Sequence, residues 1–309
     1  MQLLQELRNS ARLEQIFGEI ERIEKKAREV AKDILDFLTS SSSETLIYAY
    51  TGYGLLPASI SYWFSVTMRS QSTLLLDVED ASLYVLPYRE DVSMVVFSAE
   101  EYSKLFSSLQ AARLLGVKYR AYAQDPVDER YKILAKHYSV NTVPGRNTYE
   151  TSLLLSLSTF FAHSKYYMNS LQLRSRRLFT HGEEGFAVVA KSLIEKYTPI
   201  LEKIFALNSL HVSSSRILEA PARLLTRVLS ELGIEAVYTP HAEIASVGKK
   251  PLLVTYVSLE DRAFRELKAF RREGLLELVL NTDPLEAGIY LSIIAFVLSQ
   301  LKPRTELQL

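Results

Sequence analysis

Residues 45–71 read TLIYAYTGYGLLPASISYWFSVTMRSQ, and this stretch predicts the fold of the chain. An apolar run over residues 46–50 stops at the Thr-Gly-Tyr-Gly of residues 51–54, and a long segment with apolar periodicity follows at once. The pattern predicts a strand, a tight glycine turn and a helix. Glycines let the backbone of such a turn approach a ligand closely, and the helix behind it offers free N–H groups to an anion. An ordinary short connection between a strand and a helix is the alternative.

The glycine turn does not complete the fingerprint of a dinucleotide-binding protein. It contains Gly-x-Gly but lacks the third glycine at the start of the helix. Such proteins also carry an acidic residue at the end of the second strand, and Asp77 is the only candidate there. The missing third glycine disfavours a nucleotide-binding oxidoreductase, and no acidic residue other than Asp77 can be assigned to the second position.

Composition narrows the class of protein further. The chain has 309 residues, of which 48% are apolar, and its formal net charge is zero. That length suits two domains of ordinary size, and the neutral balance gives no long-range attraction to nucleic acid or to an anionic membrane. There is no cysteine, which excludes disulfides, thiolate nucleophiles and zinc–thiolate sites. The N-terminus lacks the pattern of a signal peptide, and no apolar stretch reaches about 18 residues. We therefore expect a soluble cytoplasmic protein.

Strands and helices alternate along the first half of the chain. An amphipathic helix is expected over residues 12–38, before a polar linker over 39–44. Five strands are expected at residues 46–50, 73–77, 93–98, 118–123 and 138–143. Further helices are expected at residues 99–115 and 148–168. A small basic cluster is expected in the loop that follows, as a solvated connection or a phosphate site: Arg174, Arg176 and Arg177.

The second half of the chain repeats this order of strand, turn and helix. A boundary is expected at His181-Gly182-Glu183-Glu184, before a helix over residues 185–207. Strands are expected at residues 210–212, 234–238, 251–257 and 275–280, and helices at residues 217–232, 261–272 and 283–301. We predict an α/β fold of two doubly wound parallel-sheet domains joined by helices. The expected boundaries are 1–44 for the N-terminal helix and linker, 45–182 for the first domain and 183–309 for the second.

Ligands of such sheets bind outside the carboxyl ends of the strands. The candidate ligand-binding residues at these positions are Thr51, Gly52, Gly54, Ser98, Arg146, Ser213 and Ser214. Serines before a helix also serve as N-terminal caps, which is the alternative for the last two.

The order of these features resembles the tandem sugar-isomerase (SIS) domain proteins. More narrowly, it resembles the archaeal bifunctional phosphoglucose/phosphomannose isomerase family over roughly residues 45–304. Four stretches carry the resemblance: the glycine turn, VVFSAEEYSKL at residues 95–105, Val143-Pro144 before an apolar helix, and Asp283-Pro284-Leu285 before a helix that ends in Leu301-Lys302. Ser98 matches the second serine of the family's Ser-x-Ser-Gly-x-Thr loop. The resemblance implies two SIS-like domains and a homodimer, with the helix at residues 13–38 contributing to its interface.

Several positions depart from the family's phosphate-binding pattern. The family has Gly-Ser-Gly where residues 55–57 here are Leu-Leu-Pro. In the second loop, the family's first serine, its glycine and its phosphate-binding threonine are replaced by Val96, Ala99 and Glu101. A carboxylate about 4 Å from a phosphate repels it by on the order of a few kcal/mol per charge pair. Either Arg146 or another cation compensates, or this loop does not hold a phosphate in the family's way.

The resemblance implies an aldose–ketose isomerisation through an ene-diol, without a metal or an organic cofactor. In the family a glutamate moves a proton between C1 and C2 of the open sugar, and a histidine opens the ring. The candidates here are Glu219 for the glutamate, and His241 with Glu243 in the loop after the strand at residues 234–238. Counting without gaps instead puts Leu225 at the position of the base, which removes the base. Ordinary surface roles for His241 and Glu219 are the alternatives.

Two hypotheses of function follow from the resemblance. The first is a sugar-phosphate isomerase of the phosphoglucose/phosphomannose type. The second is a non-catalytic SIS-like paralogue that binds a sugar derivative or another protein. The residues Leu56, Val96, Glu101 and Leu225 favour the second hypothesis, and the order of features favours the first. The expected partner is a small sugar or sugar phosphate, and neither nucleic acid nor a membrane.

Overall fold

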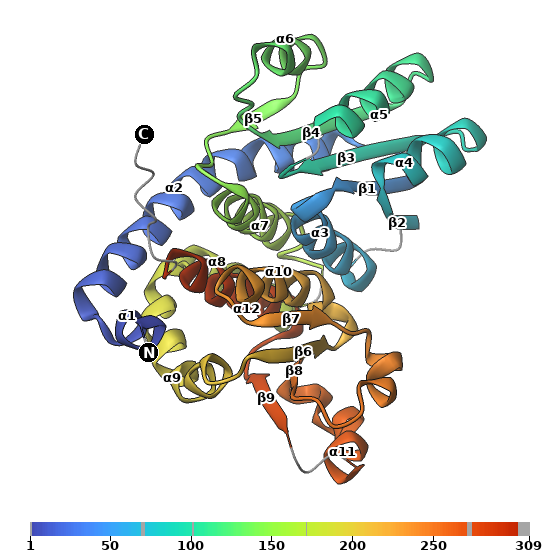
Figure 1. Ribbon diagram of the computed structural model, residues 1–309. Coiled ribbons are helices and arrows are strands. Elements are labelled where there is room, and N and C mark those ends of the chain that lie inside the picture. The colour runs from blue at the N-terminus through green and yellow to red at the C-terminus, as the bar shows by residue number, and fades with distance from the viewer. Residues whose placement is uncertain (1, 69–71, 101, 171, 271–273, 302–309) are drawn as a thin grey trace. The chain divides into compact units, whose positions relative to one another are not determined.

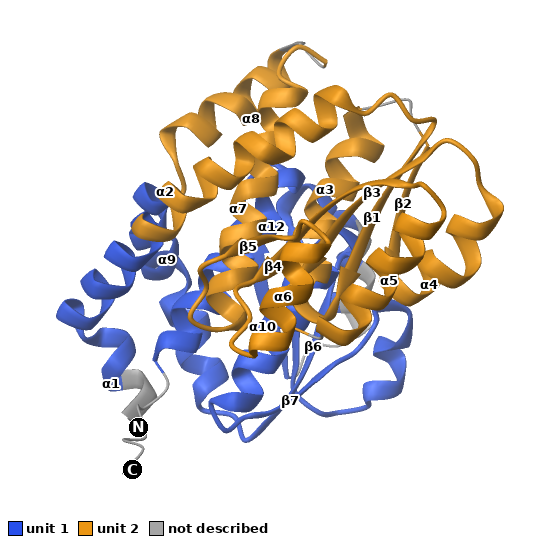
Figure 2. Ribbon diagram, turned by 90° about the horizontal axis from the view of Figure 1, so that it is seen from above, with its two compact units in different colours: residues 1–21, 187–309 blue, residues 22–186 orange. Residues whose placement is uncertain are grey.

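The chain forms two compact units in the computed structural model, which describes residues 2–68, 72–100, 102–170, 172–270 and 274–301. Unit 1 comprises residues 1–21 and 187–309, and unit 2 comprises residues 22–186 (Figure 2). Each unit contains one parallel sheet with helices, so the predicted α/β fold is confirmed (Figure 1). Among the described helices, none is both long enough and apolar enough to cross a membrane.

The predicted N-terminal amphipathic helix is also confirmed. A short helix α1 (Gln2–Arg8) precedes the long helix α2 (Ser10–Ser40). The fully buried positions Ile16, Ile20, Ile23, Ala27 and Ile34 recur at helical spacing along α2 and form its apolar face. Residues 10–21 of this helix belong to unit 1, and residues 22–40 belong to unit 2.

The sheet of unit 2 has the strand order β2-β1-β3-β4-β5, with every neighbouring pair parallel. The strands are β1 (Thr45–Thr51), β2 (Ser72–Asp77), β3 (Val92–Ser98), β4 (Lys118–Gln124) and β5 (Asn141–Val143). The central strands β1 and β3 are apolar runs buried along almost their whole length, as expected for a sheet covered on both faces. The strand order reverses between β1 and β3, and ligands of open α/β sheets bind at such a switch point.

Helices follow the strands of unit 2 in chain order. They are η1 (Gly52–Gly54), α3 (Leu55–Met68), α4 (Val78–Asp80), η2 (Ala81–Val85), η3 (Leu86–Tyr88), α5 (Tyr102–Leu114), α6 (Glu129–His137), α7 (Thr148–Tyr166) and α8 (Gln172–Glu184). The strand, turn and helix predicted from residues 45–71 are thus β1, η1 and α3. The fifth strand is shorter than expected, because only residues 141–143 pair with β4.

Helix α7 is buried over residues 149–164 and packs against α3. Its buried hydroxyls donate to carbonyl oxygens of its own backbone, as Ser156 Oγ does to Ser152 at 2.6 Å. His163 Nε2 lies 2.8 Å from the hydroxyl of Tyr48 in β1, and that hydroxyl lies 2.8 Å from Ser65 Oγ in α3. The side chains of Ser156, His163, Tyr48 and Ser65 therefore have partners, which makes their burial tolerable.

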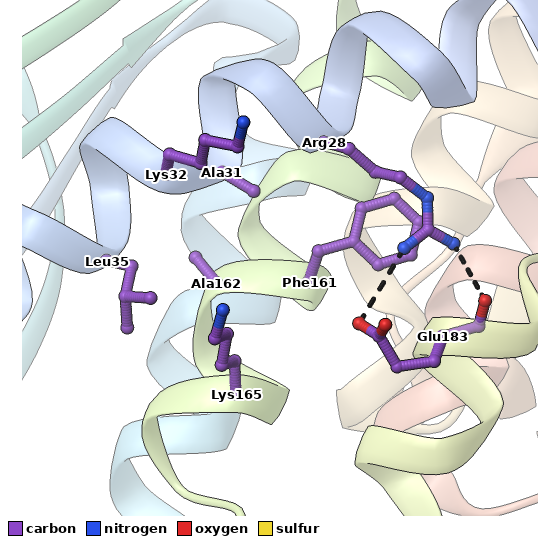
Figure 3. A pocket seen from close by; sticks show the side chains of 8 residues that line it. All are labelled: Arg28, Ala31, Lys32, Leu35, Phe161, Ala162, Lys165 and Glu183. Atoms are coloured by element: carbon purple, nitrogen blue, oxygen red, sulfur yellow. Dashed lines mark hydrogen bonds and ion pairs between the residues drawn. The ribbon is translucent and has the colours of Figure 1, made fainter.

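The basic cluster at Arg174, Arg176 and Arg177 lies in helix α8, so its prediction as a loop was wrong. The helix escaped notice because it is polar and buries few side chains, among them Ser175 and Leu178. Helix α8 is tied to α2 by Arg28, whose Nη2 donates to the carbonyl oxygen of Gly182 at 2.7 Å. Figure 3 shows the contacts of the same guanidinium with Glu183, whose carbonyl oxygen lies 3.3 Å from Nη2.

Unit 1 repeats the topology of the first four strands of unit 2. Its parallel strands β6 (Ser209–Ser214), β7 (Glu235–Tyr238), β8 (Leu252–Val257) and β9 (Leu275–Leu280) have the order β7-β6-β8-β9. Its helices are α9 (Ala187–Phe205), η4 (Arg216–Leu218), α10 (Glu219–Glu231), η5 (His241–Val247), η6 (Ser258–Glu260), α11 (Asp261–Phe270) and α12 (Pro284–Gln300). The order reverses between β6 and β8, so the switch point of unit 1 lies at the carboxyl end of β6.

Candidate binding sites at the carboxyl ends of the strands

In unit 2, the hydroxyls predicted to bind ligand lie together at the switch point. Thr51 ends β1 and is the register partner of Ser98 at the end of β3. Thr51 Oγ1 donates to Ser98 Oγ at 2.8 Å, and Ser98 Oγ donates to the carbonyl oxygen of Glu100 at 2.6 Å. Both side chains are fully buried. Their hydrogen bonds are therefore made within the protein.

The two positions of the turn are glycine for different structural reasons. Gly52 has a φ of +50°, a conformation that side chains with a Cβ rarely adopt. A Cβ at Gly54 would lie 2.0 Å from the carbonyl oxygen of Phe97. The turn thus packs closely on the end of β3, and this side of Gly54 faces protein backbone.

A carboxylate stands beside the glycine turn. A Cβ at Gly52 would lie 3.6 Å from Oε2 of Glu100, and Thr148 Oγ1 donates to Oε1 of the same carboxylate at 2.7 Å. The negative charge at this loop was predicted from Glu101, which lies outside the described residues. Glu100 was not predicted to carry a charge at this loop. Its position two residues after Ser98 was a sufficient signal. A dianionic phosphate at this turn meets repulsion from Glu100.

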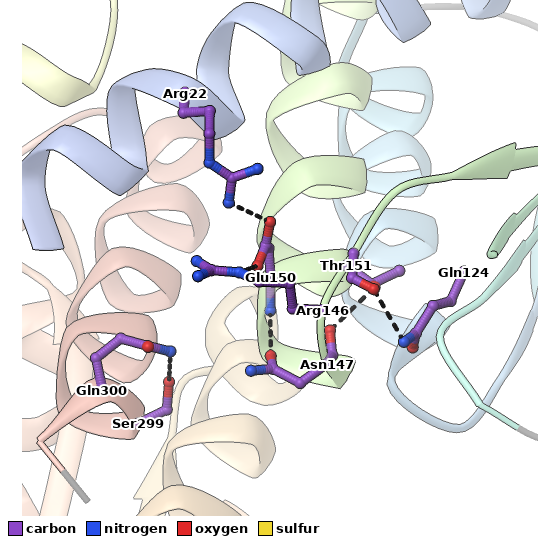
Figure 4. A network of polar contacts seen from close by, with 9 residues as sticks. Arg22, Gln124, Arg146, Asn147, Glu150, Thr151, Ser299 and Gln300 are labelled. Carbon is purple, nitrogen blue, oxygen red and sulfur yellow. Dashed lines mark hydrogen bonds and ion pairs between the residues drawn. The ribbon is translucent and has the colours of Figure 1, made fainter. Parts of the chain in front are cut away.

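Arg146, the predicted cation of this edge, is paired with a buried carboxylate (Figure 4). Its Nε donates to Oε2 of Glu150 at 2.7 Å, and Nη2 of Arg22 donates to Oε1 at 2.5 Å. Asn147 caps α7 by accepting from the backbone N–H of Glu150 at 2.9 Å. The Glu150 side chain is 1% exposed, so the two arginines serve first to neutralise it.

The Glu150 cluster makes stability depend on pH. Burial raises the pKa of Glu150, but hydrogen bonds from Arg146 and Arg22 outweigh it and hold the pKa below its usual value. A lowered folded-state pKa stabilises the protein above the unfolded-state pKa of about 4.3, and this contribution is lost as the pH falls through the folded-state value. The free energy of unfolding of Glu150→Gln should thus be lower than that of the parent by about 1–3 kcal/mol at pH 7. In urea titrations this difference should shrink below about pH 4. A difference that stays constant from pH 7 to pH 3 contradicts the assignment.

In unit 1, the serine loop (residues 213–215) lies at the switch point between β6 and β8. Ser215 donates its backbone N–H to the carbonyl oxygen of Thr255 in β8 at 3.0 Å. The side chains of Ser213 and Ser215 are 0% and 7% exposed, and within the described residues neither hydroxyl has a hydrogen-bond partner. Buried hydroxyls without partners are rare and unfavourable, so these two differ from the satisfied hydroxyls of Thr51 and Ser98.

Ser214 is the first of several polar side chains that contact one another next to the serine loop. Its Oγ lies 3.2 Å from the hydroxyl of Tyr238, and the guanidinium of Arg223 lies 4.7 Å from the centroid of the Tyr238 ring. Arg223 in turn pairs with Glu219 at 2.8 Å. Burial raises the pKa of Tyr238, the hydrogen bond from Ser214 opposes this, and the Glu219 charge adds to the rise. The sequence analysis missed Arg223 and Tyr238, although Arg223 follows Glu219 at the i,i+4 spacing of helical ion pairs.

The remaining predicted catalytic residues lie in and near η5. His241 and Glu243 are both exposed, and the His241 ring packs edge-on against Phe264 of α11 with 4.8 Å between centroids. Leu225, the residue at the ungapped position of the base, is fully buried in α10. Of the three predicted catalytic side chains, Glu219 pairs with Arg223 of its own helix, and His241 contacts Phe264 of α11. Among the described residues, no three His, Asp or Glu side chains are arranged to hold a metal ion.

Comparison with known proteins identifies the fold. No protein-family model and no curated protein sequence matches this chain. A candidate phosphosugar isomerase from Silicibacter pomeroyi DSS-3 has a similar structure, with a TM-score of 0.69 and 12% identity over 97% of this chain and 96% of that chain. The C-terminal domain of glucosamine-fructose-6-phosphate aminotransferase from Francisella tularensis gives a TM-score of 0.61 and 14% identity over 94% and 95%. Tagatose-6-phosphate ketose/aldose isomerase from Escherichia coli gives 0.59 and 11% over 97% and 93%.

These likenesses extend over nearly the whole of each chain. The protein therefore has the fold of the SIS-type phosphosugar isomerase structures. At identities of 11–14% the likeness establishes the fold alone, because one fold supports several chemistries.

Proposed function

We propose that this protein binds a sugar or a sugar phosphate at the serine loop of unit 1. The observation that carries the proposal is the pair of buried hydroxyls, Ser213 Oγ and Ser215 Oγ, which have no partner within the described residues. A sugar hydroxyl both donates and accepts hydrogen bonds, so a sugar can satisfy two serines at once. The loop also lies at the switch point of its sheet, where open α/β sheets bind ligands. The shared fold with phosphosugar isomerases supports this class of ligand by analogy.

The serine loop is a better candidate than the glycine turn of unit 2. The hydroxyls of Thr51 and Ser98 are already hydrogen-bonded within the protein, and the Glu100 carboxylate stands beside Gly52. A phosphate bound there needs these contacts to break, and it also meets charge repulsion. A ligand at the serine loop instead adds hydrogen bonds to hydroxyls that lack them.

The second candidate function is an aldose–ketose isomerase of the phosphoglucose/phosphomannose type. It is favoured by Glu219, which opens α10 just after the serine loop and carries a side chain that is 42% exposed. In this mechanism Glu219 takes the proton from C2 of the open-chain aldose and returns it to C1 of the ene-diol. His241 transfers the proton that opens the ring, and Glu243 is the alternative carboxylate. The homodimer implied by the resemblance stays a prediction.

Titration with fructose 6-phosphate, followed by a coupled assay for glucose 6-phosphate, separates the two functions. The binding proposal expects heat of binding in the parent protein. If the protein is also an isomerase, Glu219→Gln and His241→Ala should each lower turnover by about 10²–10⁴-fold, as expected for loss of an acid–base group.

The matched control for the assay is His137→Ala, because His137 is an exposed histidine of α6 in unit 2. This variant should keep the turnover of the parent. Binding without turnover supports a non-catalytic sugar-binding protein. A folded parent protein that binds neither fructose 6-phosphate nor fructose contradicts the proposal.

A further inference from the structure

A pocket lies wholly within unit 2, between the helices α2, α7 and α8 (Figure 3). Its volume is about 210 Å³. An engineered cavity of about 150 Å³ holds a benzene molecule, so this pocket has room for one ring and part of a substituent. None of the residues that line the pocket belongs to the serine loop or to the glycine turn. The pocket is therefore a separate candidate site.

Three cations and one anion line the pocket. Arg28 is already engaged: its Nη2 donates to Oε1 of Glu24 at 2.9 Å, and its Nη1 lies 3.8 Å from Oε1 of Glu183. Lys32 of α2 and Lys165 of α7 differ from it, because within the described part of the chain their ammonium groups have no ion pair or hydrogen bond. Two exposed lysines, one from α2 and one from α7, thus line one pocket without an ion-pair partner among the described residues, and an anion bound there gains their attraction.

The remaining wall of the pocket is apolar. Ala31, Phe161 and Ala162 are buried, and Leu35 is partly buried beside them. The Arg28 guanidinium lies 4.3 Å from the centroid of the Phe161 ring, which fixes one side of the pocket. A ligand that matches these surfaces carries an anionic group and a small apolar body.

We propose that this pocket binds a phosphate monoester with a single-ring apolar body. The dianionic phosphate matches the two unpaired charges of Lys32 and Lys165, and the ring contacts the apolar wall formed by Leu35 and Phe161. A carboxylate of the same size supplies only one negative charge and binds more weakly. Inorganic phosphate lacks the apolar body and also binds more weakly.

Calorimetric titration with phenyl phosphate tests the proposal. Lys32→Met and Lys165→Met keep an unbranched side chain that is one heavy atom shorter, and they remove its charge. Each should weaken binding roughly tenfold, as for loss of one charge-assisted hydrogen bond. Lys25→Met is the control, since Lys25 is an exposed lysine of α2 that does not line the pocket. Equal affinity in all three variants and the parent overturns the proposal, as does the absence of binding. Inorganic phosphate or benzoate that binds as tightly as phenyl phosphate also overturns it.

A second readout locates the ligand independently of the variants. Acetylation of lysines by an N-hydroxysuccinimide ester is followed by mass spectrometry with and without phenyl phosphate. The proposal expects slower modification of Lys32 and Lys165 when the ligand is present, and an unchanged rate at Lys25. Unchanged modification of Lys32 and Lys165 at saturating ligand overturns the proposal.

Discussion

Replacement of Gly54 by alanine is expected to lower the free energy of unfolding by about 3 kcal/mol, the upper part of the range for overpacking. The new Cβ would lie 2.0 Å from the carbonyl oxygen of Phe97 and 3.1 Å from the backbone nitrogen of Ser98. Both atoms belong to β3, which is hydrogen-bonded to β1 on one side and β4 on the other. Because this strand cannot move without breaking the sheet, the turn itself must shift, and the Thr51–Ser98 hydrogen bond is lost with it.

Urea unfolding followed by fluorescence measures this effect. Trp63 is the single tryptophan of the chain and lies in α3, directly after the glycine turn, so its signal reports on unit 2. The control is Gly18→Ala in the part of helix α2 that belongs to unit 1, so its unfolding is followed by circular dichroism as well. An added Cβ at Gly18 meets no atom within 4 Å beyond the helix's own backbone. This control should leave stability unchanged or raise it by up to about 1 kcal/mol. Equal stability of Gly54→Ala and the parent contradicts the close packing of the turn on β3.

Removal of both orphan hydroxyls of the serine loop is expected to weaken the binding of fructose 6-phosphate about a hundredfold. Each hydrogen bond to the ligand contributes about tenfold in affinity, and the double variant Ser213→Ala/Ser215→Ala loses two of them. The free energy of unfolding should stay the same or rise, because neither hydroxyl has a partner in the folded chain within the described residues. Loss of binding without loss of stability distinguishes a ligand site from a structural role.

Ser98→Ala is the matched variant for this experiment. Ser98 Oγ donates to Glu100 and accepts from Thr51, so its removal should lower the free energy of unfolding by about 1 kcal/mol. The affinity for fructose 6-phosphate should remain that of the parent. The opposite pattern, with binding lost in Ser98→Ala and kept in the double variant, assigns the ligand to the glycine turn instead.

The strands were predictable because the signal for each of them, a short run of mostly apolar residues, is contained in consecutive residues. Strands β1, β3 and β8 are continuous apolar runs bounded by polar or turn residues, and their burial follows from the sequence directly. The helices α6 and α8 were not predicted. Helix α6 buries only Ala135 among its nine residues, so it has almost no apolar periodicity, and a cap at Asp128 helps to define it.

The positions of the candidate residues in the fold were predictable, but their hydrogen bonds were not. The carboxyl ends of the strands place Thr51, Ser98 and the serine loop correctly at the two switch points. Whether a hydroxyl there is free depends on strand register, and the pairing of Thr51 with Ser98 is set by residues 47 positions apart. Likewise, the contact of Arg146 with Glu150 has helical spacing and was visible, but Arg22 reaches the same carboxylate from 128 positions away.

The central claim is that the ligand binds at the serine loop of unit 1 and not at the glycine turn of unit 2. A crystal structure of the protein with fructose 6-phosphate tests it most directly. The account predicts a ligand oxygen about 2.7–3.2 Å from Ser213 Oγ or Ser215 Oγ, with the hydrogen bonds of Thr51 and Ser98 unchanged. A phosphate bound to the glycine turn, with the Glu100 carboxylate displaced, contradicts the account.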